Sequence, residues 1–197
     1  MATPSTKIPQ DILLASRCAL GDRQSCGEVF HQQKNRVHAT LYRVLGRNLD
    51  MEDLIQESFI EIFKSLESFR GEAQLSTWID RITVRVAYGY LRRKKGKTAR
   101  LEAIPEIPDH DPNAEQRLLL QEATRRLHQL LDSLDAKMRI AFTLHAIDER
   151  SLVEVADLMS ATLVGTKTRV WRARRILAKR ARHDSLLSNY LQDIQGK

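Results

Sequence analysis

The sequence has 197 residues, of which 42% are hydrophobic and 29% are charged, a balance that excludes low-complexity and fibrous classes. Its formal net charge is +7 and its pI is about 9.6, which favours an acidic partner such as nucleic acid. No apolar run could cross a membrane and no secretion signal begins the chain, so we expect a cytoplasmic protein of one or two domains.

The chain opens with polar residues 1–9, which we expect to form a disordered tail. Helices are expected over about 10–20 and about 25–47, separated by a turn. Cys18 and Cys26 lie on either side of that turn, without the spacing of a four-ligand zinc site. Because the bacterial and eukaryotic cytoplasm keeps thiols reduced, we expect two free thiols; a redox pair is the alternative.

The stretch from Met51 to about Phe69 has apolar residues at three- and four-residue steps, which predicts a helix with one buried stripe. On its polar side, carboxylates surround the apolar Ile60. An apolar side chain ringed by charges can anchor a partner, although a plain solvated face is the alternative. The buried stripe comprises Ile55, Phe59, Ile62, Phe63, Leu66 and Phe69. The candidate docking face comprises Asp53, Gln56, Glu57 and Ile60.

A polar turn over residues 69–74 follows, with Gly71 supplying conformational freedom. Ser76 or Thr77 is expected to cap the next helix. No acidic residue occurs from Arg81 to Leu101, and cations with an aromatic ring on one face suit phosphates and unpaired bases. A solvated basic helix end is the alternative to this nucleic-acid face, which comprises Arg81, Arg85, Tyr88 and Arg92.

Residues 98–115 contain three prolines and five acidic residues, immediately after a basic run. Prolines keep a chain extended, and the reversal of charge marks a boundary between domains. We therefore expect a flexible acidic linker here.

The second half contains a predicted helix that ends near Ser133 and another, capped by Asp135, that runs to about Ile147. His145 on the latter has no second ligand one turn away, so we interpret it as a partly buried or surface residue and expect no metal. Ser151 is expected to cap a helix over 152–159, with Glu154 completing a capping box.

A tight turn at Ser160 and Ala161 leads to a helix over about 163–182, capped by Thr162, with no acid between Ala161 and Arg182. Its expected inner stripe is Leu163, Thr166, Val170, Ala173 and Leu177. A short helix, a turn and a basic second helix predict a helix-turn-helix that reads the major groove. Solvent, RNA and a membrane surface are the alternatives for the basic face.

Two sets of motifs resemble the bacterial RNA polymerase sigma factors, most closely the extracytoplasmic-function (ECF, group IV) kind. Those that resemble the second conserved region are Asp53-Leu54-Ile55-Gln56-Glu57-Ser58-Phe59, Phe69-Arg70-Gly71 and Thr77-Trp78-Ile79-Asp80-Arg81-Ile82. Those that resemble the fourth are Leu131-Asp132-Ser133-Leu134, Val155-Ala156, Lys167-Thr168-Arg169 and Arg172-Ala173-Arg174-Arg175. Together they cover roughly residues 10–182, in the family's order.

The resemblance implies an all-α fold of two small helical domains joined by the linker, the second domain containing the helix-turn-helix. The expected divisions are a tail over 1–9, a region 2-like domain over 10–97, the linker over 98–115, a region 4-like domain over 116–183, and a tail over 184–197. The resemblance implies a sigma factor that binds core RNA polymerase and promoter DNA and has no enzymatic activity or cofactor. It also implies an anti-sigma factor that inhibits the protein.

The resemblance also assigns residues. Core polymerase would bind Asp53, Gln56, Glu57 and Ile60. The promoter −10 element would contact Arg70, Gly71, Glu72, Arg81, Arg85, Tyr88, Arg92 and Arg93. The −35 element would be read by Thr162, Lys167, Thr168, Arg169, Arg172 and Arg175.

Four positions depart from the family pattern. Arg85 and Gly89 stand where Asn and Asp are common, and Ser160 and Gly165 stand where a turn glycine and a threonine are common. We expect these changes to alter promoter preference. The rival interpretations are a stand-alone helix-turn-helix regulator and a helical RNA-binding or interaction protein. The acidic face around Ile60 discriminates against the regulator, which does not need it.

Overall fold

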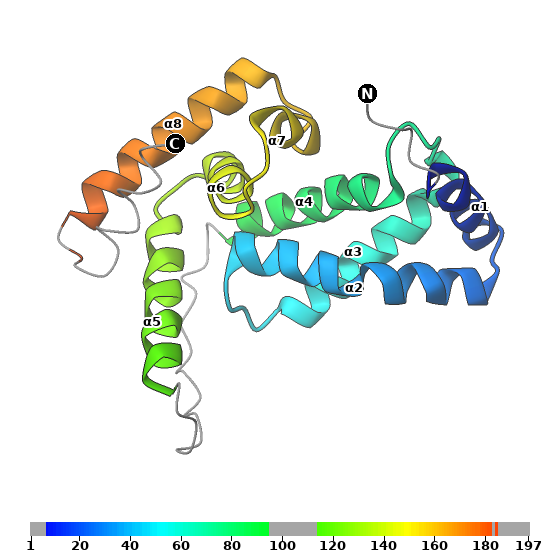
Figure 1. Cartoon of the computed structure of the whole chain (residues 1–197), viewed down its shortest axis with the longest axis horizontal. Coiled ribbons are helices and arrows are strands. Elements are labelled where there is room, and N and C mark those ends of the chain that lie inside the picture. Colours follow the sequence, from blue (N-terminus) through cyan, green and yellow to red (C-terminus); the bar gives the residue numbers. More distant parts are fainter. Residues whose placement is uncertain (1–6, 95–113, 183, 185–197) are drawn as a thin grey trace.

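The structure, a computed structural model, describes residues 7–94, 114–182 and 184, and it is helical with no strand in these ranges (Figure 1). The all-α prediction is therefore confirmed for the described part of the chain. The linker predicted over 98–115 lies outside these ranges except for residues 114 and 115, and the tail predicted over 184–197 lies outside them except for residue 184. The disordered tail predicted over 1–9 is wrong at its end, because residues 7–9 are helical.

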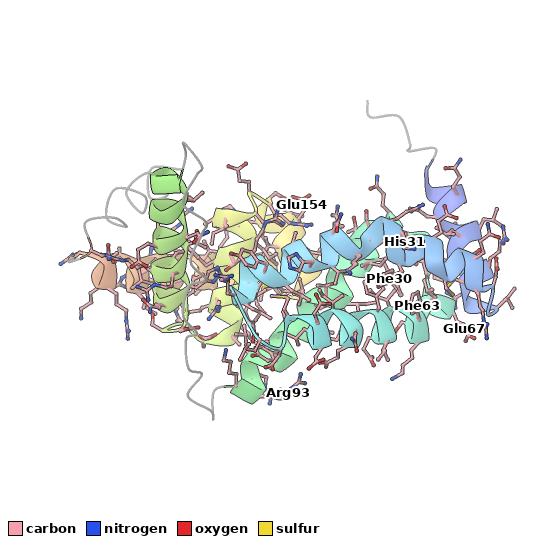
Figure 2. All side chains as sticks on the ribbon, turned by 90° about the horizontal axis from the view of Figure 1, so that it is seen from below. Phe30, His31, Phe63, Glu67, Arg93 and Glu154 are labelled. Atoms are coloured by element: carbon pink, nitrogen blue, oxygen red, sulfur yellow. A yellow bond between two sulfur atoms is a disulfide. The ribbon has the colours of Figure 1, made fainter. Side chains whose placement is uncertain are left out.

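The N-terminal half consists of α1 (Lys7–Ala19), α2 (Arg23–Leu45), α3 (Met51–Ser65), the 3-10 turn η1 (Leu66–Ser68) and α4 (Leu75–Lys94). The predicted stripe, which follows α3 and η1 as far as Phe69, is buried as expected, with Phe63 partly buried at its edge. The ring of Phe30 on α2 lies 4.6 Å from that of Phe59, and Figure 2 shows Phe30 and Phe63 between the two helices. The helix predicted to reach Phe69 ends earlier, at Ser65.

The C-terminal half consists of α5 (Ala114–Leu131), α6 (Ala136–Phe142), the π-helical turn η2 (Thr143–Ile147), α7 (Leu152–Leu158) and α8 (Leu163–Ala181). The three predicted caps are confirmed. Asp135 accepts from the backbone N–H of Met138 at 2.9 Å, Ser151 and Glu154 form the capping box, and Thr162 accepts from the N–H of Gly165 at 3.1 Å.

The turn between α7 and α8 has the hydrogen bonds of a Schellman motif. The N–H of Ala161 donates to the carbonyl of Ala156 at 2.8 Å, and that of Ser160 donates to Asp157 at 3.0 Å. The motif requires a left-handed residue, and Ser160 adopts φ of 47° there. Ser160 therefore takes the conformation of the glycine that it replaces relative to the family pattern.

Two local predictions are wrong. Ser76 and Thr77 lie inside the first turn of α4, because the helix begins at Leu75, whose N–H donates to the carboxylate of Asp11 on α1 at 2.8 Å. A cap supplied by a distant helix leaves no local sequence signal. Leu163 is 38% exposed rather than part of the inner stripe; it is the first residue of α8, and the buried stripe begins one turn later at Thr166.

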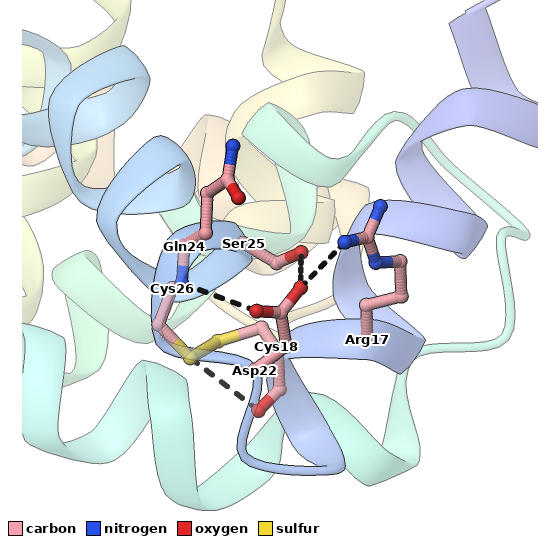
Figure 3. The surroundings of a disulfide bond; sticks show 6 residues. All are labelled: Arg17, Cys18, Asp22, Gln24, Ser25 and Cys26. Carbon is pink, nitrogen blue, oxygen red and sulfur yellow. Dashed lines mark hydrogen bonds and ion pairs between the residues drawn. A yellow bond between two sulfur atoms is a disulfide. The ribbon is translucent and has the colours of Figure 1, made fainter.

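The expectation of two free thiols is also wrong, because Cys18 and Cys26 form a disulfide (Figure 3). Gly21, with φ of 89°, turns the chain sharply after α1, which brings the two Cα atoms to 4.8 Å. Asp22 secures the turn by accepting from the hydroxyl of Ser25 and the guanidinium of Arg17, and these bonds hold its pKa below the usual value. The disulfide therefore links the end of α1 covalently to the start of α2.

The two halves pack together rather than standing apart. Apolar residues of α6, η2 and α7, including Ile140, Leu144 and Val155, belong to the same buried cluster as the core of the N-terminal half. Arg139 on α6 is 3% exposed and donates to the carbonyls of Val44 and Leu45 at the end of α2, at 2.6 and 3.1 Å. A smaller second cluster joins α5, α6 and α8.

Candidate nucleic-acid interface and docking face

The docking face predicted on α3 is a single surface. Asp53, Gln56 and Ile60 are exposed, Ile60 by 51%, while Leu54, Ile55, Ser58 and Phe59 beneath them anchor the helix in the core. Glu57 lies at its border, where its carboxylate is 3.1 Å from the guanidinium of Arg93 at the end of α4. A large apolar side chain among exposed polar and acidic groups is suited to a protein partner that carries basic residues.

The turn between η1 and α4 presents the next three predicted residues. Phe69 is buried with its ring 5.6 Å from that of Trp78, and this contact fixes one end of the turn. Gly71 has φ of 72°, a left-handed conformation that glycine adopts without strain. Arg70 and Glu72 consequently project into solvent beside the start of α4.

The basic face of α4 is present, but its members differ in their surroundings. Arg85 and Arg92 are exposed, and the Arg92 guanidinium lies 5.7 Å from the ring centre of Tyr88. Arg81 instead pairs with Asp157 of α7 at 2.7 Å, and Lys137 of α6 lies 5.9 Å from the Tyr88 ring. Arg93 is exposed and pairs with Glu57 of the docking face, as described above.

Asp80 lies next to Arg81 on the same helix. It belongs to the motif over residues 77–82, but no role was predicted for it. It is fully buried, and its carboxylate binds the guanidinium groups of Arg36 at 2.7 Å and Arg150 at 2.9 Å. An acid within the apolar period of a helix is a signal that could have marked it, because a buried charge requires a partner. Its second partner, on the other half of the chain, could not have been identified from spacing.

The recognition helix α8 carries the predicted cations on its outer face. Lys167, Thr168, Arg172 and Arg175 are exposed, Arg169 is half-buried, and Thr162 caps the helix. The inner residues Thr166, Val170, Ala173 and Leu177 are buried. The structure therefore brings all six predicted residues to one helix whose other side is fixed in the core.

Trp171 also belongs to this surface, although the site prediction left it out. It is 55% exposed, and the Arg175 guanidinium lies 4.7 Å from its ring centre. A shallow groove beside it is lined by Trp171, Met138, Arg172, Arg175, Ile176 and Lys179. An exposed aromatic among arginines was the available signal, because such a ring contacts bases or sugars.

The described residues were compared with the requirements of a metal site and of a membrane-spanning helix. No group of three His, Cys, Asp or Glu side chains among them could hold a metal ion. His145 has its Nδ1 2.8 Å from the carbonyl of Arg150, which accounts for it as a hydrogen-bonded, partly buried residue. None of the helices that the structure describes has the length and apolar character needed to cross a bilayer.

Two family models match the chain. Residues 29–97 match sigma-70 region 2, and residues 124–177 match sigma-70, region 4, so that together the matches span more than half of the sequence.

Relatives of the same kind align over most of the chain. The ECF RNA polymerase sigma-E factor of Haemophilus influenzae is 29% identical over 177 residues, covering 85% of this chain and 93% of that protein. The ECF RNA polymerase sigma factor SigW of Bacillus subtilis is 28% identical over 171 residues, covering 82% and 91%. SigE of Mycolicibacterium smegmatis is 33% identical over 166 residues, covering 81% and 63%.

Two solved structures have the same fold. One is CnrH in complex with the cytosolic domain of CnrY, with a TM-score of 0.62, 22% identity, and coverage of 89% of this chain and 99% of that one. The other is the sigma factor RpoE in complex with the anti-sigma factor NepR from Bartonella quintana, with a TM-score of 0.56, 20% identity, and coverage of 80% and 97%.

Proposed function

The chain belongs to the ECF sigma factors of the sigma-70 family, and from this membership we propose how its surfaces divide the work of transcription initiation. As a member of that family it binds RNA polymerase, recognises promoters to initiate transcription, and is not an enzyme.

The docking face of α3 binds core polymerase in this proposal. The supporting observation is the exposure of Ile60 beside Asp53 and Gln56 on a helix whose opposite side is anchored in the core. The apolar side chain would be buried in the complex, and the carboxylates would meet basic residues that fix the orientation.

The turn at residues 70–72 and the face of α4 contact the melted −10 element. Arg85 and Arg92 supply exposed positive charge for phosphates, and Tyr88 supplies a ring for stacking on an unpaired base. A base that leaves the duplex costs a few kcal/mol of stacking and pairing, which such contacts offset.

The outer face of α8 reads the −35 element in the major groove. Its N-terminal residues reach base edges in helix-turn-helix proteins, and the cations further along bind phosphates. Arginine, here Arg169 or Arg172, is the residue type that most often reads guanine.

The division into domains over 10–97 and 116–183, joined by the linker, and the cytoplasmic location are parts of the same proposal. The matched ranges for regions 2 and 4 support the division, and the work of a sigma factor on polymerase supports the location. An anti-sigma partner is proposed as well, because a solved relative of this fold is an anti-sigma complex.

The docking assignment is tested with full-length protein and sigma-free core polymerase. Asp53→Lys is expected to abolish co-migration with polymerase, because it places a cation where basic residues should dock, and to leave binding to a −35 duplex unchanged. Glu28→Lys, a charge reversal at an exposed acid on α2, is the matched control and should retain both activities.

Equal loss of polymerase and DNA binding in Asp53→Lys would indicate misfolding rather than a docking role. Retention of both would remove Asp53 from the docking face. The stand-alone regulator has no use for region 2, and the match to region 2 leaves it without support.

A further inference from the structure

Gly165 occupies the first turn of α8 in ordinary helical backbone, so no backbone strain requires a glycine there. Glycine within a helix costs about 0.5–1 kcal/mol relative to alanine. Neighbouring side chains, however, leave no room for a Cβ at this position. A Cβ at this position would lie 2.9 Å from Nη1 of Arg169 and 2.9 Å from Oγ1 of Thr162.

Arg169 lies one turn further along the same helix, and its side chain extends back over Gly165, as long helical side chains generally do. Its Nη1 is shielded from solvent and donates no hydrogen bond within the described structure. The guanidinium thus rests in a notch that only glycine leaves open, with its Nη1 turned into that notch.

An arginine at the N-terminal part of a recognition helix is placed to reach base edges, and its planar guanidinium matches O6 and N7 of guanine. We propose that Gly165 is a positioning residue for sequence readout, whose missing side chain holds the guanidinium of Arg169 in position to read a guanine of the −35 element. This inference rests on the proposed function of α8.

The test measures binding of the full chain to a panel of −35 duplexes in which each base pair is substituted in turn. Arg169→Ala should lose about 5- to 150-fold of the discrimination at one G·C pair, the range for a bidentate contact. Gly165→Ala should lose part of the discrimination at that same pair. The double variant should be no worse than Arg169→Ala, because both changes remove one contact.

Gly27→Ala is the matched control, since Gly27 is also helical and a Cβ there meets nothing within 4 Å. It should keep the whole pattern of preference and melt no lower than the parent protein. A thermal melt of Gly165→Ala checks that this variant is folded at the assay temperature, because its Cβ also crowds the capping hydroxyl of Thr162. If Arg169→Ala leaves every pair's discrimination unchanged, the assignment of Arg169 to base reading fails. If it acts but Gly165→Ala changes nothing, or weakens all duplexes equally, the positioning role is overturned.

Discussion

Asp80 and Arg150 form an ion pair of 2.9 Å that joins α4 to the loop before α7, and the Asp80 side chain is only 1% exposed. Arg36 of α2 donates to the same carboxylate from the other side, at 2.9 and 2.7 Å. One buried charge therefore connects three segments of the chain. Its removal leaves two guanidinium groups without their shared partner.

We expect Asp80→Asn to lower the free energy of unfolding by about 2–3 kcal/mol, less than the value for a fully buried pair because Arg36 is partly exposed. Urea denaturation followed by circular dichroism measures the change. Asp53→Asn on α3 is the control and should stay within about 0.5 kcal/mol of the parent. Similar values for the two variants would show that the buried carboxylate adds no stability.

Ser160→Gly should stabilise the protein. Ser160 has φ of 47°, and a left-handed conformation costs a residue with a side chain roughly 1–2 kcal/mol, partly offset by the greater freedom of glycine in the unfolded chain. The net gain is expected to be about 0.5–1 kcal/mol, seen as a higher melting temperature. Ser160→Ala, which keeps a Cβ, should give no such gain, and a lower melting temperature for the glycine variant would contradict the argument.

Reduction of the disulfide should destabilise the chain. Cys18 and Cys26 are eight residues apart, for which loop-closure entropy gives about 2.5 kcal/mol. The oxidised protein should therefore unfold at higher urea concentration than the same protein in a phosphine reductant. Cys18→Ser should match the reduced parent and be insensitive to reductant. If the oxidised and reduced parent proteins unfold at the same urea concentration, the disulfide contributes nothing to stability.

His128 should make stability depend on pH. Its ring lies against Gly46 and Tyr42, and burial, with the charge of Arg139 second, lowers its pKa from 6.5 to about 4, although Asp132 acts in the opposite direction. Between these values the unfolded chain binds a proton that the folded chain does not. The stability is therefore complete above pH 6.5 and falls by up to about 3 kcal/mol as the pH approaches 4.

Urea midpoints measured from pH 7.5 to 4 test this expectation, with His128→Gln as the comparison. The variant lacks the titrating group, so the difference between its midpoint and that of the parent should change across this range. Parallel curves for the two proteins would exclude His128 as the source of acid sensitivity.

Local signals predicted the helices and most of their caps. Asp135, Ser151 and Thr162 each bind a backbone N–H within three residues of themselves, so their roles follow from neighbouring sequence. The surfaces on α3 and α8 were predictable for the same reason, since helical periodicity decides which residues share a face. The cap of α4 was missed because Asp11 reaches it from another helix.

The sequence by itself therefore determined the helices, the exposed face around Ile60 and the basic face of α8, because these depend on residues three or four positions apart. Only the tertiary structure decided that Asp157 would cover Arg81, that Arg169 would settle over Gly165, and that Cys18 would meet Cys26. The first two depend on side-chain packing and the third on the angle of a turn. Spacing along a chain limits such contacts but does not select them.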